Sequence, residues 1–469
     1  IYPAFVQRFQ VSPAELNREE PFIELNIDAT RTALDIDEIE SNDLQYDPEL
    51  TVEEIEGQRA NLELARLMDP AALGNRGGVD GTIQTLQFGR PYYRFRDIDV
   101  DRYVFGDQPA MVAGVSDPEA EEEAVEELGN EEEGSVTTEE VVETGEDPTP
   151  VIISTRELNL SGIPSPRTWE KEHLVFTHGY AGALAPANNA NSRGEPNFLL
   201  GDIPAVTKNL PQLERPEIYV GEGMEGYAIV DTSQTELTQD DLETSYDGST
   251  GVNIDSFFRK AAFALRFGEI DPLISDLLTD ESRVIYNRDA VERVQLLAPY
   301  LLLDPDPYPV LMDGGIKYVV DGYTTSGNYP YAESFNAQEL DPEAVGETFN
   351  YVSNSVKALV DAYDGTVELF LTDTLYGGED PIIRAYAEAF PDLYSETLPS
   401  GLLDHLRYPE LLFKLQTTAW GRYHQDSPST FFNNSDLWDI AQDPPSDADA
   451  QLTTLTDENG VQTGFDRID

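Results

Sequence analysis

Cysteine is absent from this chain of 469 residues, which excludes disulfides and thiolate ligands for a metal. Long apolar runs are absent too, since no stretch of 18 or more apolar residues occurs that could span a bilayer. No signal peptide is visible at the start of the sequence. The chain begins with Ile1 rather than Met, so we expect a fragment of a longer polypeptide that carries its targeting information elsewhere.

Basic residues are scarce. The chain has 29 Lys and Arg against 90 Asp and Glu, a formal net charge of −61. Such a field repels the phosphates of nucleic acids and of anionic lipids, so we exclude DNA and RNA as partners. It favours cations and basic partners instead. The acidity suits a saline habitat or an exported bacterial surface, and solubility alone would explain it equally well.

The residues that are present supply a large core, because 40% are hydrophobic and 10% aromatic. Apolar segments on both sides of Asp313-Gly314-Gly315 and of Asp364-Gly365 predict two β-hairpins. Strand-like residues 217–220 and 227–230 flank a Gly-rich turn and predict a third hairpin. Several hairpins of this kind indicate an antiparallel sheet.

Helix start signals lie before and between these strands. Ser12-Pro13-Ala14-Glu15 predicts a helix near the N-terminus, and Pro21 predicts the start of another. Further along, Asp255 is expected to cap an apolar helical run that contains Phe258 and Leu265. The sequence therefore predicts an α+β fold, in which an antiparallel sheet built from several hairpins is combined with packed helices and a helical N-terminal segment.

Composition divides the chain into three regions. Residues 1–70 are expected to form a helical segment, residues 71–440 an α+β domain, and residues 441–469 a polar, acidic tail. Residues 117–147 contain 15 acids and no base, so self-repulsion predicts a disordered, solvated insertion within the α+β domain.

The segment Gly221-Glu222-Gly223-Met224-Glu225-Gly226 matches the GxGxxG pattern of dinucleotide-binding loops. Such a site needs a helix after the glycines, whose N-terminus receives the pyrophosphate. A strand is expected here instead, and two Glu stand where the phosphate would lie. We therefore interpret the motif as a hairpin turn and expect no nucleotide cofactor.

His178 lies in the sequence His178-Gly179-Tyr180-Ala181-Gly182, which is similar to the His-Gly loops that build oxyanion holes in some hydrolases. Those enzymes need a GxSxG nucleophile elbow, and none occurs. His178 is nevertheless the candidate catalytic residue. The more conservative interpretation gives it a structural role. A zinc site of His and carboxylate ligands stays open, although the chain has no HExxH.

Asp97, Asp99 and Asp101 alternate along the sequence. On a strand all three carboxylates would share one face, an arrangement that needs a cation or Arg partners. One interpretation is a calcium or magnesium site with these residues as ligands. The alternative is a solvated or Arg-paired strand face, for which Arg94, Arg96 and Arg102 are close in sequence.

Many short segments in one order resemble an uncharacterised bacterial membrane-protein family, uncharacterised protein family 0182. The segments that carry the resemblance are Arg90-Pro91-Tyr92-Tyr93, Asp97 to Tyr103, Thr155-Arg156-Glu157-Leu158, Thr177-His178-Gly179-Tyr180, Phe263 to Gly268, Asp306-Pro307-Tyr308-Pro309, Tyr323-Thr324-Thr325-Ser326, Asn354-Ser355-Val356-Lys357, Asp361 to Val367, His405-Leu406-Arg407-Tyr408-Pro409 and Arg422-Tyr423-His424.

The resemblance implies a location and an architecture but no activity. Members of the family combine a multi-pass transmembrane region with a large extracytoplasmic domain, and this chain resembles that domain. On this view residues 1–70 are juxtamembrane. The acidic stretch 117–147 departs from the family pattern. Many members carry a further C-terminal region, which we do not expect within these 469 residues.

Three functions follow as hypotheses. The first is a non-enzymatic extracytoplasmic domain that binds an envelope component or a membrane protein partner, besides its own transmembrane region, in assembly, scaffolding or transport. The second is a cation-dependent, envelope-directed hydrolase that uses His178 and the three aspartates. The third is a divalent-cation sensor.

Overall fold

The computed structural model describes residues 5, 7–40, 51–58, 62, 65–68, 70–74, 81–87, 90–103, 149–191, 193–239, 242–372, 380–395, 397–440, 452–456 and 462–467. The insertion expected at 117–147 lies outside these residues. By its contacts the chain divides into two units, one of residues 21–416 and one that joins residues 1–20 to residues 417–469. Helices and several antiparallel sheets together confirm the predicted α+β class.

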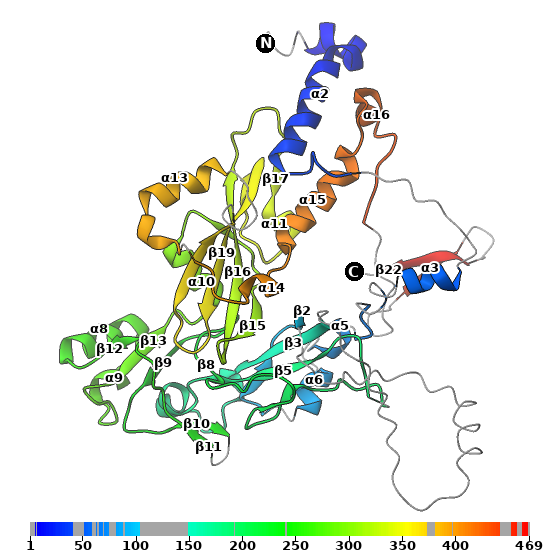
Figure 1. Cartoon of the computed structure of the whole chain (residues 1–469). Helices are drawn as coiled ribbons and strands as arrows, with labels where there is room; N and C mark the ends of the chain where they lie inside the picture. The colour runs from blue at the N-terminus through cyan, green and yellow to red at the C-terminus, as the bar shows by residue number, and fades with distance from the viewer. Residues whose placement is uncertain are drawn as a thin grey trace, which may run out of the picture. The chain divides into compact units, whose positions relative to one another are not determined.

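The first large sheet of the 21–416 unit has five strands. Its central pair, β16 (Gly315–Ser326) and β19 (Tyr351–Asp361), lies side by side in Figure 1, and β15 (Tyr308–Met312), β20 (Val367–Leu371) and β14 (Leu302–Leu303) complete the sheet. The β15–β16 and β19–β20 pairs are the hairpins predicted from their Asp-Gly turns. One face packs on α10 (Ala290–Leu297) in a core where Val294, Val320 and Val360 are fully buried.

The second large sheet of this unit has six strands. They are β1 (Tyr93–Phe95), β2 (Asp99–Tyr103), β3 (Thr149–Leu158), β5 (Gly182–Pro186), β6 (Leu200–Gly201) and β7 (Val206–Thr207). β3 is the centre of the sheet, because β1, β2 and β5 all pair with it in antiparallel register. Nine of its ten residues are buried, as expected for a strand covered on both faces.

The third predicted hairpin is wrong. Its strands exist as β8 (Glu217–Ile218) and β9 (Tyr227–Val230), but they do not pair with each other. β8 pairs with β4 (Gly179–Tyr180), and β9 pairs with β13 (Arg283–Tyr286), which also pairs with β12 (Val252–Asn253). The glycine-rich loop between β8 and β9 is therefore a connection between two sheets.

This unit also contains helices and shorter strand pairs. The bounds of these elements are α3 Val52–Gly57, α5 Pro70–Leu73, α6 Thr82–Leu86, η3 Leu160–Gly162, η4 Lys171–Val175, α8 Phe257–Phe267, α9 Asp271–Ile274, α11 Ala337–Leu340, α13 Pro381–Ala389, η5 Pro391–Leu393, α14 Leu402–His405, and the pairs β10 Glu236–Gln239 with β11 Leu242–Thr244 and β17 Phe335–Asn336 with β18 Thr348–Phe349.

Two helix predictions need correction. Pro21 does not start a helix; it lies inside α2 (Glu15–Ala33), which follows η2 (Ser12–Ala14) without a break. Helix α8 exists, but its N-cap is Ser256 rather than Asp255, since the Ser256 side chain accepts a hydrogen bond from the backbone N–H of Arg259. The apolar residues that predict it, Phe258 and Leu265, are 84% exposed.

The second unit contains η1 (Gln7–Val11), α16 (Pro428–Asn433) and the antiparallel pair β21 (Leu452–Thr456) and β22 (Gln462–Arg467). The region expected as a polar tail thus contains two strands. Helix α15 (Glu410–Tyr423) begins in one unit and ends in the other. None of the helices in the described part of the chain is both long and apolar enough to cross a bilayer.

Candidate functional site

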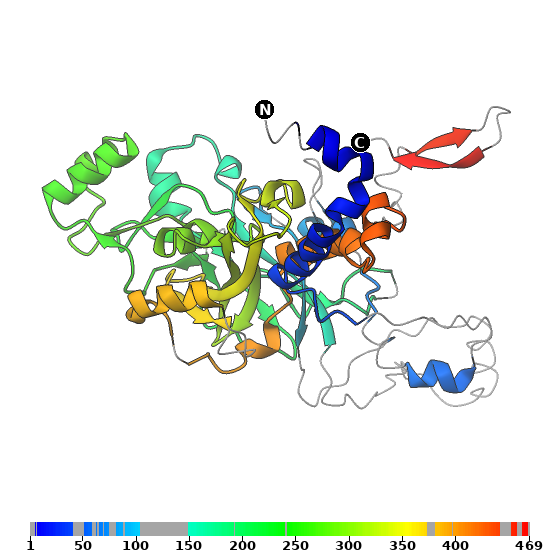
Figure 2. The same ribbon diagram turned by 90° about the horizontal axis from the view of Figure 1, so that it is seen from above.

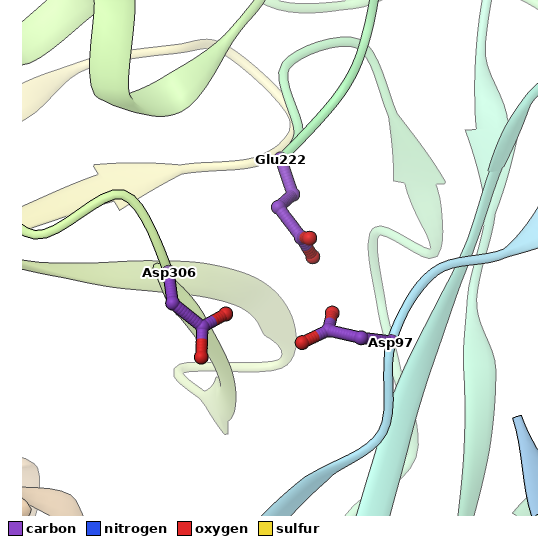
Figure 3. Close-up of side chains that lie close together, drawn as sticks. All are labelled: Asp97, Glu222 and Asp306. Carbon is purple, nitrogen blue, oxygen red and sulfur yellow. The ribbon is translucent and has the colours of Figure 1, made fainter. Parts of the chain in front are cut away.

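Three carboxylates from distant loops of the 21–416 unit meet at one point. Asp97 precedes β2, Glu222 follows β8, and Asp306 lies between β14 and β15. Figure 3 shows their side chains pointing toward one another, and one oxygen from each lies within 4.8 Å of the others. We call these residues the carboxylate triad. Asp97 is exposed, whereas the other two are half-buried.

A buried carboxylate on β3 fixes two of the three loops. Glu157 accepts hydrogen bonds from the backbone N–H groups of Glu222 (2.6 Å) and Gly223 (3.1 Å). It also accepts from Nε of Arg96 (2.7 Å), next to Asp97 in the chain, and from the hydroxyl of Tyr318 (2.9 Å). The amide groups that could have bound a phosphate in the glycine-rich loop are thus occupied by a carboxylate of the protein itself.

The glycines of this loop are needed for that approach. A Cβ atom on Gly221 would collide with the carboxylate of Glu157, and one on Gly223 would collide with the guanidinium of Arg96. The GxG pattern therefore allows the backbone to come close to an internal ion pair, and in doing so it directs Glu222 toward Asp97.

The Asp306 loop is held by a second buried carboxylate. Asp304 accepts from the backbone N–H of Asp306 (3.3 Å), from the hydroxyl of Tyr323 (2.6 Å) and from the backbone N–H of Leu411 (3.0 Å). Pro305 and Pro307 restrict the backbone on both sides of Asp306. The role of this loop in placing a carboxylate is not visible in the sequence.

The electrostatics of the triad are dominated by its own carboxylates. Burial, followed by the charges of Asp97 and Asp99, raises the pKa of Asp306 to about 9. Burial and then the charge of Asp97 raise the pKa of Glu222 well above its ordinary range. Among the described ion pairs, none joins a Lys or Arg to the triad, and Arg96 is paired with Glu157. Such a group either shares protons or binds a cation.

The triad opens on a cavity of about 540 Å³. Asp97 and Glu222 line it together with the charged residues Arg94, Arg96 and Glu343 and the less polar residues Pro70, Gly74, Phe95, Ile98 and Pro305. The cavity is therefore polar on one side, and a hydrated ion has access to the carboxylates through it.

The other two predicted ligands, Asp99 and Asp101, do not belong to the triad. Asp99 and Asp101 are buried on one face of β2, and each faces a base. The guanidinium of Arg407 donates to Asp99 (2.6 Å) and lies 3.6 Å from the ring centroid of Tyr308. Nδ1 of His405 donates to Asp101 (2.9 Å). We call these contacts the β2 pairs.

The three aspartates therefore do not share a strand face, because Asp97 precedes the strand. The bases that neutralise Asp99 and Asp101 come from about 300 residues further along the chain rather than from the adjacent arginines. Burial raises the pKa of Asp99 to about 7 despite the opposing charge of Arg407. Its second oxygen, Oδ2, is buried without a hydrogen-bond partner among the described residues.

His178 is fully buried beside β4. Its Nδ1–H donates to the carbonyl of Gly179 (2.8 Å), and its Nε2 accepts from the hydroxyl of Thr244 (2.9 Å). Burial lowers the pKa of His178 to about 4, so the ring is neutral at physiological pH. In the described structure His178 does not line the cavity of the triad. This placement corresponds to the structural interpretation of the motif.

The sequence interpretation missed Glu222 and Asp306 as candidate cation ligands. It interpreted the segment of Glu222 only as a hairpin turn and gave Asp306 no functional role. The available signal was an acidic residue beside residues that constrain the backbone, namely glycines around Glu222 and prolines around Asp306. No spacing rule connects these two residues with Asp97, because they are brought together only by the fold.

The chain matches the model of the Uncharacterised protein family (UPF0182) over residues 1–463. It is 36% identical to a UPF0182 protein of Frankia alni, with 96% of this chain and 42% of the relative covered. For a UPF0182 protein of Alkaliphilus metalliredigens the identity is 36%, with 93% and 41% covered. For one of Clostridium tetani it is 34%, with 93% and 43% covered.

The chain thus spans about two fifths of the length of these curated relatives. No solved structure gives a significant match to it. Because the family model covers nearly the whole chain, the chain belongs to the uncharacterised bacterial family UPF0182.

Proposed function

We propose that this chain is the extracytoplasmic domain of a multi-pass bacterial membrane protein. In this role it binds an envelope component or a protein partner in assembly, scaffolding or transport. Membership of UPF0182 supports the proposal through the layout that the family resemblance implies. The relatives are more than twice as long as the matched region, which leaves room for a transmembrane region in them.

The state of His178 supports a binding role over a hydrolytic one. A general base needs a free ring nitrogen within reach of substrate, and both nitrogens of His178 are engaged in a fully buried site. A cation-dependent hydrolase would need another base near the triad. If His178→Asn in the intact protein abolished an envelope-directed hydrolysis without loss of folded protein, the hydrolytic alternative would replace the binding role.

Protease accessibility tests the location. The intact protein, with an epitope in this domain, is expressed in its host, and protoplasts are treated with a protease that does not cross the membrane. We expect loss of the epitope, while a cytosolic marker stays intact. Protection of the epitope until the membrane is lysed, or recovery of the protein in the soluble fraction, would contradict the proposal.

Immunoprecipitation from solubilised membranes tests the binding role. We expect the same envelope protein or glycan to be recovered with the intact protein in repeated experiments. Repeated recovery of the intact protein alone would count against a binding domain.

A second candidate function is binding of a divalent cation, Ca²⁺ or Mg²⁺, at the carboxylate triad. The observation that favours it is three carboxylate oxygens within 4.8 Å of one another, since both ions prefer oxygen ligands. The buried Oδ2 of Asp99 is a second observation. It has no hydrogen-bond partner among the described residues, and its charge acts on both Glu222 and Asp306. A cation at the triad would relieve this repulsion.

Thermal unfolding with added CaCl₂ or MgCl₂ tests the cation site. We expect either salt to raise the melting temperature of the natural protein more than that of Asp306→Asn. Glu388→Gln is the matched control, because Glu388 is an exposed acid on α13, away from the triad. NaCl at equal ionic strength corrects for counterions around the acidic surface. An equal change in the melting temperature of all three proteins would mean that the cation acts by general screening. This result would contradict a cation site at the triad.

A further inference from the structure

Helix α8 presents an apolar face to solvent. Phe257, Phe258 and Leu265 are 65%, 84% and 84% exposed, and no residue of the helix is buried. In the short helix α9 that follows, Ile270 just before it and Ile274 at its end are 63% and 67% exposed. Figures 1 and 2 both show α8 and α9 at the edge of the 21–416 unit, away from its two large sheets. Apolar patches of this kind mark interaction sites.

The exposed apolar residues form one continuous face. With about 100° of rotation per residue, Phe257, Ala261, Leu265, Phe258 and Ala262 follow one another over an arc of about 140°. The opposite side holds the helix on the protein. There Phe267 stacks on Tyr227 with ring centroids 3.9 Å apart, and Phe263 meets Tyr286 edge-on at 5.7 Å. The helix is thus anchored by one apolar side and exposed on the other.

The charge of α8 is opposite to that of the chain. Its sequence, FFRKAAFALRF, has three basic residues and no acid, whereas the whole chain has three acids for each base. Arg259 and Arg266 follow the exposed face at its border, where they are exposed as well. The guanidinium of Arg266 also lies 4.9 Å from the ring centroid of Tyr286 on β13, and that of Arg259 lies 3.3 Å from the carboxylate of Asp255.

We propose that α8 docks on a lipid bilayer that carries anionic headgroups. Phenylalanine and leucine on one face with arginine at its border are typical of helices that lie in the plane of a membrane interface. The aromatic and aliphatic side chains enter the boundary of the acyl chains, and the arginines reach the phosphates. With 11 residues the helix is too short to span the bilayer.

The acidic remainder of the chain is repelled by an anionic bilayer. This repulsion favours the orientation in which α8 faces the lipid. A net charge of −61 repels an anionic surface at long range, but at physiological salt this field is screened beyond about 8 Å. A cationic, apolar element at an edge of the domain can therefore approach the lipid. The inference rests on the proposed function for the presence of a bilayer next to the domain.

Flotation with vesicles tests the contact. The chain is mixed at 0.15 M NaCl with vesicles of phosphatidylcholine and phosphatidylglycerol, or of phosphatidylcholine alone. We expect flotation with the anionic vesicles, and a decrease of at least about tenfold in the partition coefficient for Phe258→Ser combined with Leu265→Ser. Leu296→Ser is the matched control, because Leu296 is a 61% exposed apolar residue on α10, and it should float like the natural chain.

Tryptophan fluorescence tests whether helix α8 enters the lipid. The emission of Phe258→Trp should shift to shorter wavelength with anionic vesicles, and Arg259→Gln combined with Arg266→Gln should weaken flotation. Equal flotation of the double Ser variant, or equal binding to neutral vesicles, would overturn the inference. A chain that does not float but dimerises through this face, with dimers lost in the double Ser variant, would overturn it in favour of self-association.

The two proposals fail separately. Absence of flotation would leave the protease accessibility of the intact protein unchanged. Protection of the intact protein from external protease would contradict the extracytoplasmic location. Vesicle binding by the isolated chain would still test the lipid contact. Because the substituted side chains of α8 are exposed, circular dichroism and melting temperature should match those of the natural chain and serve as the folding control.

Discussion

The carboxylate triad and the β2 pairs begin two residues apart in the sequence, yet their surroundings are opposite. In the β2 pairs each carboxylate faces a base from residues 405–407. In the triad each carboxylate faces another carboxylate. The difference comes from the segments that fold against them, because loops 221–226 and 304–307 bring acids and residues 405–407 bring bases. The chemistry of an acidic residue is therefore set by its long-range partner rather than by its spacing.

The two regions should respond in opposite ways to loss of charge. Where a buried carboxylate is paired with a base, the protein loses stability when the base is removed, because the charge left behind has no compensation. Where carboxylates face one another, the protein gains stability when one charge is removed, because repulsion and the cost of burial both decrease. Substitutions in the two regions can therefore be compared directly in one unfolding assay.

The largest effect is expected for Arg407→Met. It removes the base from Asp99, whose side chain is 4% exposed, while keeping an unbranched side chain against Tyr308. We expect a loss of about 2 kcal/mol in the free energy of unfolding at pH 8. The charge supplies at most about 1.4 kcal/mol of it, because Asp99, with a pKa of about 7, takes up a proton once the base is gone. The measurement is urea unfolding followed by fluorescence.

The pH and a double variant control for the mechanism. At pH 5.5 the loss should shrink, because Asp99, with a pKa of about 7 even beside Arg407, takes up a proton. Adding Asp99→Asn to Arg407→Met should recover part of the loss at pH 8. A loss of the same size at both pH values would mean that packing on Tyr308, and not charge, is the contribution of Arg407.

A smaller effect of opposite sign is expected for Asp306→Asn. In the natural chain Asp306 holds a proton in the folded state between the ordinary pKa of 3.8 and about 9. Its contribution to stability is therefore full below the lower value and is lost as the pH rises toward the upper one. At pH 8 with a chelator we expect the variant to be more stable by roughly 1–2 kcal/mol, after allowance for partial exposure.

Chemical unfolding of both proteins from pH 5 to pH 9 gives the measurement. The difference between Asp306→Asn and the natural chain should grow with pH. Added calcium should reverse it, since a cation neutralises the natural site and not the variant. A difference that is constant with pH would show that Asp306 is already ionised in the folded protein at pH 5.

Elements with local signals could be predicted from the sequence. The β15–β16 and β19–β20 hairpins follow from Asp-Gly turns between apolar segments, and the strand partners are adjacent in the chain. The third hairpin failed because β8 and β9 look alike locally but find partners in different sheets. Pairing between distant strands depends on which surfaces are free in the folded chain, and that information is not contained in a short window.

The candidate site had the same limitation. Asp97 could be singled out because three aspartates alternate, but Glu222 and Asp306 reach it only through the packing of loops around Glu157 and Asp304. Helix α8 is a related case, since periodicity found the helix without indicating which of its apolar faces is packed. Sequence periodicity reports that a face is apolar, and only the tertiary structure decides what covers it.

The second β2 pair should be weaker than the first. In His405→Gln the amide can still donate to Asp101, so the variant tests the ring contact with Tyr103, whose centroid lies 4.6 Å from that of His405. We expect a loss of about 1 kcal/mol in urea unfolding. A loss as large as that of Arg407→Met would mean that both bases carry equal weight in holding residues 405–407 on β2.

The smallest change in stability is expected for Asp97→Asn. This variant therefore tests the electrostatics of the triad with the least effect on the stability of the fold. Asp97 is exposed, so its substitution should alter the free energy of unfolding at pH 5 by less than about 0.5 kcal/mol. Its charge is nevertheless the largest charge effect that raises the pKa of Asp306, after burial. The variant should reduce, without abolishing, the loss of stability between pH 5 and pH 9 that Asp306→Asn removes. If Asp97→Asn left that pH dependence unchanged, the three carboxylates would not act as one group in solution, and the triad would be no different from any other acidic surface of this chain.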